Sequence, residues 1–407
     1  AALSGFSGSA AQSSKLWDTG RASTAVSVVA DGGVGAASAA AFIGRELQRR
    51  GVQTRLLGAG GSDSHRLDAR SDGRHSVSVS EVPGMDGYSI ECTTRADGVM
   101  VASVVGGSSG VGGGAARLLR ELLVWSTGKV RCPSGGLAIR TREADGRWAL
   151  RGHQITAAHY PGMFREMDGL KQFTDELKVF GTNQVELAHF TLKEGVNTTS
   201  LVSFSRAIDS VGGANVSFWW PCCSTVSVAE TLAAVAAMPR VDSLFFPGGD
   251  GGSLDWPSIK AVAGGLRVHH PGAAVWVSAQ ELSEADLESF ARTVTSAPVR
   301  QYLTGVVYGP HVRVPLTKFV ELLGNIPVRQ YPDICHSLGC QYPVPAWHSA
   351  WVFTHGRQTI NPTAAMMANI IKLRSNGSTP TVGVGAYSEG LNDDLNKAVW
   401  SAMAEDA

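Results

Sequence analysis

From Leu150 onwards the chain repeats one pattern, a short apolar run followed by a helical segment. The apolar runs are the expected strands, and they span Leu150–Ala157, Gln184–His189, Val216–Trp220, Val241–Phe246, Ala274–Ser278, Gly305–Tyr308, Val328–Tyr331 and Thr381–Tyr387. Short continuous apolar runs are typical of strands that are buried on both faces, as in a parallel sheet. Eight such units in roughly 250 residues predict a (β/α)8 TIM barrel over residues 146–407.

The segments between these runs carry helical spacing. In the first of them one apolar stripe recurs at intervals of three and four residues, through Phe164, Met167, Leu170, Phe173, Leu177 and Phe180. The other helices are expected at about Val202–Val211, Val226–Met238, Pro257–Leu266, Ser283–Ser296, Pro315–Leu323, Thr363–Leu373 and Asp393–Met403. The last of these helices completes the barrel pattern.

Residues 1–145 form a different unit, rich in Gly, Ser and Ala. Strands are expected at Thr24–Ala30, Val52–Leu57, His75–Val82, Tyr88–Thr93 and Val99–Val105, and helices at Ala36–Arg50 and Ala115–Trp125. This order predicts a small α/β sandwich domain that precedes the barrel.

Two glycine-rich loops in this domain are candidates for binding a nucleotide. The loop from Asp31 to Ala36 follows a strand and opens a helix, as a dinucleotide-binding loop does. Ser38 stands at the third small position, and no acidic residue follows at the ribose-binding distance. We therefore favour a plain strand-to-helix turn over nucleotide binding, and we expect Gly106–Gly114 to be a flexible turn before the next helix.

Composition excludes several classes of function. The formal net charge is zero, which gives no reason to expect a nucleic acid as partner. No run of about 18 apolar residues is present, so no membrane span is expected. The 6 cysteines form no CxxC pair, and neither a metal nor a cofactor is predicted.

The same residues favour a secreted or lumenal glycoprotein. Sequons occur at Asn197, Asn215 and Asn376, and the cysteine count is even. The chain starts at Ala1 without an initiator Met or a signal peptide, which suggests a processed or truncated product. Cys335 and Cys340 are close enough in sequence to pair, but geometry must decide.

The carboxyl ends of barrel strands are where reactive groups sit in this fold. In strand order these ends carry Arg151 and His153, Glu186 and His189, Trp219 and Trp220, Asp250, Gln280 and Glu281, Tyr308 and His311, Asp333 and His336, and finally Tyr387, Ser388, Glu389, Asn392 and Asp393. Carboxylates and aromatic rings that converge without a metal signature are what glycoside cleavage requires. Asp250 and Glu389 are the leading catalytic pair, with Asp333 as a competitor. The substrate-binding candidates are Arg151, His153, Glu186, Trp219, Trp220, Gln280, Tyr308, His311, His336, Tyr387, Asn392 and Asp393.

Each candidate also has a structural interpretation. Asp250 could cap the following helix or shape a glycine turn, and the Glu389 carboxylate could interact with the positive N-terminal end of a helix. Asp333 could instead orient a neighbouring side chain of the site. Successive strand residues face opposite ways, so at most one of Trp219 and Trp220 faces the pocket. Arg151 and His153 share one face, where ion pairing and sugar contact are equally consistent with the sequence.

Acyl transfer is disfavoured. Ser388 lacks the Gly-x-Ser-x-Gly elbow of hydrolases, and Cys222 and Cys223 have no evident base beside them.

Seven blocks at or near the strand ends resemble the glycoside hydrolase superfamily that includes α-glucuronidases and β-N-acetylhexosaminidases, in particular an uncharacterised glycosidase-like branch. The blocks are Arg151–Gln154, Phe180–Asn183, Pro247–Asp250, Tyr308–Pro310, Tyr331–Ile334, Cys340–Pro345 and Tyr387–Gly390. The N-terminal domain, with Gly87–Ile90 and Ala116–Leu119, is similar to a hexosaminidase-like domain that precedes the barrel in that superfamily. The resemblance implies a glycosidase acting on a carbohydrate.

One difference from that family narrows the class of substrate that the resemblance implies. Hexosaminidases place two adjacent acids at the end of strand four, whereas Asp250 is followed by Gly251 and Gly252. The glucuronidase-like branch fits better, and Arg151, His153, His311, Arg313 and Lys397 could neutralise a uronate. The alternative function is a catalytically inactive barrel that acts as a glycan-binding or structural extracellular protein.

Overall fold

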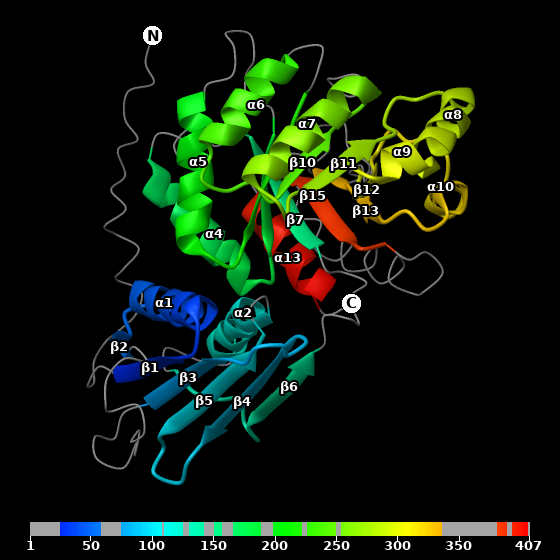
Figure 1. Cartoon of the computed structure of the whole chain (residues 1–407). Coiled ribbons are helices and arrows are strands. Elements are labelled where there is room, and N and C mark those ends of the chain that lie inside the picture. Colours follow the sequence, from blue (N-terminus) through cyan, green and yellow to red (C-terminus); the bar gives the residue numbers. More distant parts are fainter. Residues whose placement is uncertain are drawn as a thin grey trace, which may run out of the picture.

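The computed structural model describes residues 25–57, 75–107, 110–124, 130–141, 150–156, 166–188, 198–221, 226–249, 254–335, 381–388 and 393–405. These residues form an N-terminal α/β domain and a barrel (Figure 1). The predicted boundary near residue 145 falls between described segments and stays a prediction. No helix within the described ranges has both the length and the apolar character needed to cross a bilayer.

The N-terminal domain is built on a six-stranded mixed sheet with the order β2-β1-β3-β5-β4-β6. Its strands are β1 (Ala25–Asp31), β2 (Gln53–Leu57), β3 (His75–Glu81), β4 (Tyr88–Thr94), β5 (Met100–Gly106) and β6 (Leu137–Thr141). β1, β2, β3 and β5 pair in parallel, and β4 runs antiparallel to both β5 and β6. Except for β6, which was not predicted, each strand lies within about a residue of its predicted position. Cys92 on β4 forms a disulfide with Cys132, across a Cα–Cα distance of 5.7 Å.

Two helices, α1 (Val34–Arg49) and α2 (Gly110–Val124), lie between this sheet and the barrel (Figure 1). The prediction of a flexible turn through Gly114 was wrong, because α2 begins at Gly110. The glycines allow close packing on the sheet: a Cβ at Gly110 would lie 2.2 Å from the carbonyl oxygen of Gly87, and one at Gly114 would lie 2.7 Å from the Val104 side chain. Close approach, rather than flexibility, accounts for these glycines.

The second sheet closes into an eight-stranded parallel barrel, as predicted. Its strands are β7 (Leu150–Thr156), β8 (Gln184–Ala188), β9 (Asn215–Trp219), β10 (Ser243–Phe246), β11 (Ala274–Ser278), β12 (Gly305–Tyr308), β13 (Val328–Gln330) and β15 (Gly383–Ser388). The seam is the pairing of β15 with β7, where Val384 lies opposite Arg151.

The seventh strand is interrupted at Pro332. A short segment, β14 (Asp333–Cys335), continues beyond it and pairs only with β15 among the described strands. Proline has no N–H to donate and so cannot continue a ladder. Its carbonyl oxygen accepts from the N–H of Tyr387 at 2.9 Å, which keeps the broken strand attached to β15.

Helices surround the barrel. They are α4 (Met167–Val179), α5 (Thr198–Val211), α6 (Val228–Ala237), α7 (Trp256–His269), α8 (Glu284–Thr295), α9 (Ala297–Arg300), α10 (Leu316–Leu323) and α13 (Asp393–Glu405). The helix predicted at Thr363–Leu373 lies outside the described residues. The large outer core fills the space between these helices and the outward side chains of the strands, such as Val216, Leu244, Val275 and Val306.

Candidate active site at the barrel mouth

The barrel interior contains a polar layer in place of the apolar side chains that usually fill such barrels. Glu186 on β8 lies at its centre and accepts from Arg329 on β13 at 2.7 Å and from Ser217 on β9 at 2.9 Å. Gln154 on β7 donates to the other carboxylate oxygen, and Ser217 also contacts Ser243 on β10. Five strands are thus joined through side chains inside the barrel.

Arg329 fits in this space because of its neighbours. Its guanidinium carbon lies 4.9 Å from the ring centroid of Phe245 and 5.4 Å from that of Trp276, both within cation–π range. A Cβ at Gly385 would lie 3.1 Å from its Nη1, so a glycine on β15 leaves room for the guanidinium. The ion pair with Glu186 is almost completely buried, with exposed fractions of 1% and 0%.

An aromatic layer lies above the polar one, toward the carboxyl ends of the strands. Trp219, Phe245, Tyr331 and Tyr387 belong to one inner cluster with Ala188 and Val307. Tyr331 meets Phe245 and Tyr387 edge-to-face, with centroid distances of 6.1 and 6.4 Å. All four rings are buried, so they form an apolar layer inside the carboxyl end of the barrel.

Asp333 is the one predicted catalytic acid that lies within the described residues. It begins β14, is buried, and lies opposite Tyr387 in the ladder. The interruption at Pro332 places this carboxylate beyond the main seventh strand. It is therefore next to the aromatic layer at the carboxyl end of the barrel.

The loops after β10, β11 and β12 form one part of the rim. A Cβ at Gly248 would lie 2.5 Å from the carbonyl oxygen of Ser278, and a Cβ at Gly249 would lie 2.7 Å from Cβ of Glu281. The two glycines of the Pro-Gly-Gly-Asp segment therefore allow the first two loops to touch. Glu281 in turn approaches His311, with 3.6 Å between Oε1 and Nδ1.

Gln280 was predicted to bind substrate, and the structure buries it under this rim. Its amide oxygen accepts from Ser278 at 3.2 Å, and its side chain covers Gly309, where a Cβ would lie 2.4 Å away. Gln280 supports the loop after β12, whereas the adjacent Glu281 remains half-exposed.

Four of the predicted substrate-binding residues lie outside the barrel interior. The Arg151 Nε donates to the carbonyl oxygen of Gly181 at 2.6 Å, and Trp220 donates to Thr231 on α6 at 2.8 Å. The Tyr308 hydroxyl donates to the carbonyl oxygen of Val314 at 3.0 Å. His153, the fourth, contacts Ser401 on α13 at 2.7 Å. Trp219 and Trp220 do face opposite ways, as predicted.

The pKa of His153 reflects this position. Burial lowers it well below 6.5, and the positive charge of the neighbouring Lys397 acts in the same direction. His153 is therefore neutral at physiological pH. Together with its contact to α13, this gives it a role in holding the last helix against the barrel wall.

Several predicted site residues cannot be placed. Asp250, Glu389, His336 and Asn392 lie outside the described residues, and Asp393 is described only as the first residue of α13. Their roles stay predictions. Within the described part of the chain no cluster of three or more His, Cys, Asp or Glu side chains could hold a metal ion.

Arg329 and Glu281 were not among the predicted site residues. A charged residue inside the apolar run Val328–Tyr331 was the available signal for Arg329. Glu281 was noted at the end of strand five, yet Gln280 was selected. The positive φ angle of Glu281, +63°, has no signature in the sequence of that loop.

The glycine loop at the start of α1 is occupied by a carboxylate from the same domain. The N–H of Ala36 donates to Oε2 of Glu81 at 3.3 Å, and a Cβ at Gly33 or Gly35 would lie 2.8 Å from the same oxygen. A negative side chain thus fills the place where a phosphate would bind. The plain strand-to-helix turn is the interpretation that this geometry supports.

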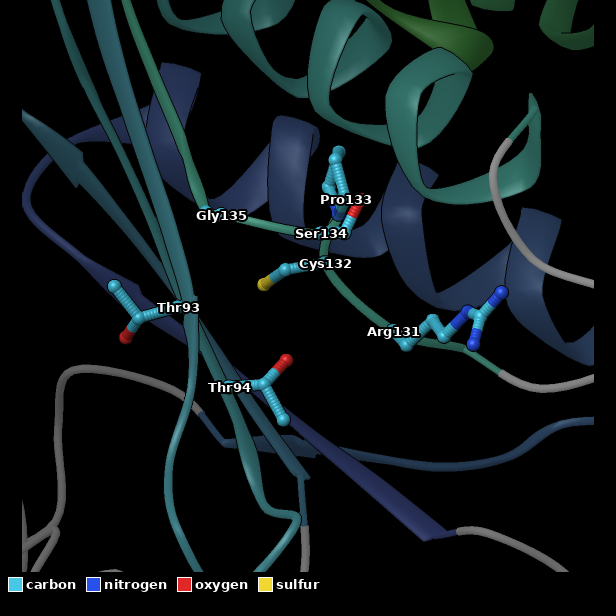
Figure 2. Close-up of a pocket in the computed structure, with 8 residues that line it drawn as sticks. Thr93, Thr94, Arg131, Cys132, Pro133, Ser134 and Gly135 are labelled. Carbon is cyan, nitrogen blue, oxygen red and sulfur yellow. The ribbon is translucent and has the colours of Figure 1, made fainter.

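One cavity, of about 490 Å³, lies in the N-terminal domain beside the disulfide (Figure 2). Its lining residues are Thr93, Thr94, Arg131, Cys132, Pro133, Ser134, Gly135 and Gly136. Figure 2 shows the Arg131 side chain directed away from Thr93, so the polar groups do not converge. The cavity shares no residue with the strand ends of the barrel.

No protein-family model matches this chain, and no curated protein matches its sequence. Among solved structures, a GH138 enzyme targeting the pectin rhamnogalacturonan II is similar with a TM-score of 0.59 and 12% identity, over 93% of this chain and 50% of that one. A GH10 xylanase from termite gut with a bacterial Ig-like domain gives 0.40 and 9%, over 75% and 81%. Dihydropteroate synthase from Xanthomonas albilineans gives 0.38 and 11%, over 63% and 93%.

The TM-scores of the xylanase and the synthase, 0.40 and 0.38, are too low to support a structural comparison. The first similarity extends over nearly the whole chain, including the N-terminal domain, while the chain spans half the length of the GH138 enzyme. At 12% identity it concerns the fold and no individual residue. The chain therefore shares its two-part architecture with a glycoside hydrolase.

Proposed function

We propose that this chain is a glycoside hydrolase that cleaves a glycosidic bond at the carboxyl-terminal mouth of its barrel. The observation that carries the proposal is the aromatic layer of Trp219, Phe245, Tyr331 and Tyr387 beneath a rim that holds acidic groups. Carboxylates at the rim supply the acid and base that glycoside cleavage requires, and the buried aromatic layer gives them an apolar support. The fold shared with a GH138 enzyme is consistent with this proposal.

Asp250 and Glu389 are the proposed catalytic pair, and Asp333 is the third candidate. Asp250 follows directly after Gly249 in the chain, and Glu389 follows β15, so both come from carboxyl ends of barrel strands. One carboxyl group protonates the leaving oxygen, while the other acts as base or nucleophile. Asp333 is buried and lies opposite Tyr387 in the ladder.

The test is turnover of a panel of aryl glycosides and aryl uronides by the purified chain. The variants Asp250→Asn and Glu389→Gln should each lower kcat by about 10²–10⁴-fold, the usual contribution of a general acid or base. Asp255→Asn is the matched control, because this exposed residue makes no side-chain cap to α7. Glycan binding without turnover by the unmodified chain would favour the alternative, an inactive glycan-binding barrel.

A uronic-acid-containing glycan, as for an α-glucuronidase, is the narrower substrate proposal. Of the five basic residues suggested for a uronate, Arg151, His153 and Lys397 lie on the helix side of the barrel wall. His311 and Arg313, both exposed in the loop after β12, are the two that support the proposal. Arg313→Gln should raise KM for a uronide and leave KM for the corresponding neutral glycoside unchanged.

A secreted or lumenal location is also proposed. It is supported by the disulfide between Cys92 and Cys132, since such bonds persist in oxidising compartments. Asn197 and Asn376 lie outside the described residues, and Asn215 is half-buried with its amide oxygen accepting from Arg240 at 3.4 Å. Mass analysis of the protein from a secreting host, before and after glycosidase treatment, checks which sequons carry a glycan.

A further inference from the structure

Glu281 has a backbone conformation that its side chain disfavours. Its φ angle is +63°, and among the described residues it is the single non-glycine residue with positive φ. The left-handed region brings Cβ close to the backbone, so glycine or asparagine is the usual residue there. Strained residues of this kind concentrate at functional sites, where the surrounding structure holds them.

The neighbouring loop is adapted to this residue. Gly249 leaves space for Cβ of Glu281, and Gly248, with φ of +69°, brings the loop after β10 against the carbonyl oxygen of Ser278. Two consecutive glycines thus hold the loops after β10 and β11 in contact at Glu281. Any larger side chain at Gly249 would displace the glutamate.

The carboxylate itself faces the rim. Its Oε1 lies 3.6 Å from Nδ1 of His311, and the two side chains are 45% and 61% exposed. A ligand at the mouth can therefore reach both groups. Gln280, the residue before it, is buried and supports the loop, whereas the Glu281 side chain is accessible.

We infer that Glu281 is a catalytic carboxylate of this barrel, acting as the base or nucleophile on the anomeric carbon. The inference rests on the proposed glycosidase function and gives Glu281 the role of base or nucleophile that one member of the Asp250–Glu389 pair would otherwise have. A half-exposed carboxylate at the rim meets both the sugar and water, as this role requires. The general acid, in contrast, is usually kept protonated by apolar surroundings, and Asp250, Glu389 and Asp333 remain the candidates for it.

The reaction balances with water as the sole co-reactant. As base, Glu281 takes a proton from water while the water oxygen bonds to the anomeric carbon. The bond from that carbon to the glycosidic oxygen breaks, and the oxygen keeps the electron pair and receives a proton from the acid. As nucleophile, Glu281 would form the bond itself, and water would later release the sugar.

The test compares Glu281→Gln and Glu281→Gly with the matched control Glu288→Gln, at an exposed position on α8. On an activated aryl glycoside that the unmodified chain hydrolyses, both Glu281 variants should lose at least about 100-fold in kcat, and the control should keep its activity. Glu281→Gly should not lower the thermal midpoint, because glycine adopts this backbone readily.

Chemical rescue separates catalysis from structure. Added azide should restore at least about tenfold in turnover to Glu281→Gly and yield a glycosyl azide, because azide then supplies the electron pair that attacks the anomeric carbon. Unchanged activity of Glu281→Gln, or a loss that azide does not restore, would overturn the inference while the proposed function stands. Absence of turnover by the unmodified chain on every glycoside overturns the proposed function, and the inference with it.

Discussion

At the scale of single residues, the barrel interior depends on the charge of Arg329. Its Nε and Nη1 have no hydrogen-bond partner within the described ranges, so Glu186 is its main compensation. Glu186 was predicted to bind substrate, but its carboxylate already accepts from Arg329, Gln154 and Ser217. The sequence could not reveal this, because strands buried on both faces show no alternation that tells inward from outward positions.

Replacing Glu186 with Ala should therefore destabilise the chain by about 3–5 kcal/mol, since it leaves a buried guanidinium without a partner. The double variant Glu186→Leu/Arg329→Met should recover most of that loss, because it removes the unpaired charge together with its partner. Urea unfolding gives both free energies of unfolding. A single variant as stable as the unmodified chain would show that the ion pair does not hold the interior together.

At the scale of elements, the barrel was largely predictable, and its β strands lie within about two residues of the predicted runs apart from the break at Pro332. The apolar runs and turn residues carried enough information for this. The orientation of the side chains was harder to predict from the sequence. His153 and Trp220 end up against helices, because odd and even positions of a strand face opposite sides and the register relative to the barrel axis depends on closure.

The burial of His153 between β7 and α13 should make stability depend on pH. Its pKa in the folded chain lies below 6.5, so the unfolded chain binds more protons as the pH falls below 6.5. Stability should then decrease by up to about 1.4 kcal/mol per pH unit, until the pH passes the folded pKa. His153→Gln should remove this component, and thermal unfolding between pH 7.5 and 5 measures it.

The matched control for His153 is His269→Gln, which changes an exposed residue at the end of α7. It should keep the pH dependence of the unmodified chain. An identical pH dependence in His153→Gln would mean that other groups cause it.

At the scale of the whole molecule, a charged interface joins the two domains. Asp175 on α4 is fully buried and pairs with Arg45 and Arg49 on α1, at 2.9 and 3.2 Å. Glu405 on α13 pairs with Arg120 on α2 at 2.7 Å and accepts from the Tyr88 hydroxyl at 3.2 Å. Figure 1 shows α1 and α2 beneath α4 and α13, the helices that follow the first and last barrel strands.

Lys178 adds an unfavourable charge to this interface. Burial lowers its pKa to about 8, although Asp175 acts in the opposite direction. Asp175→Ala should therefore leave Lys178 buried without its carboxylate and destabilise the chain by about 3 kcal/mol. Asp168→Ala, on the same helix but 94% exposed, should change stability by less than about 1 kcal/mol. Thermal unfolding of both variants measures the difference, and equal stability would mean that the interface does not depend on Asp175.

The position of the N-terminal domain has a consequence for the order in which the chain folds. A barrel cannot close until its last strand and helix have been made, and those leave the ribosome after the N-terminal domain. The N-terminal domain is synthesised first and can fold as a unit before them. We therefore expect Arg120 and Tyr88 to be in place before α13 is made, so that the N-terminal domain provides a template on which Glu405 and the last barrel helix dock.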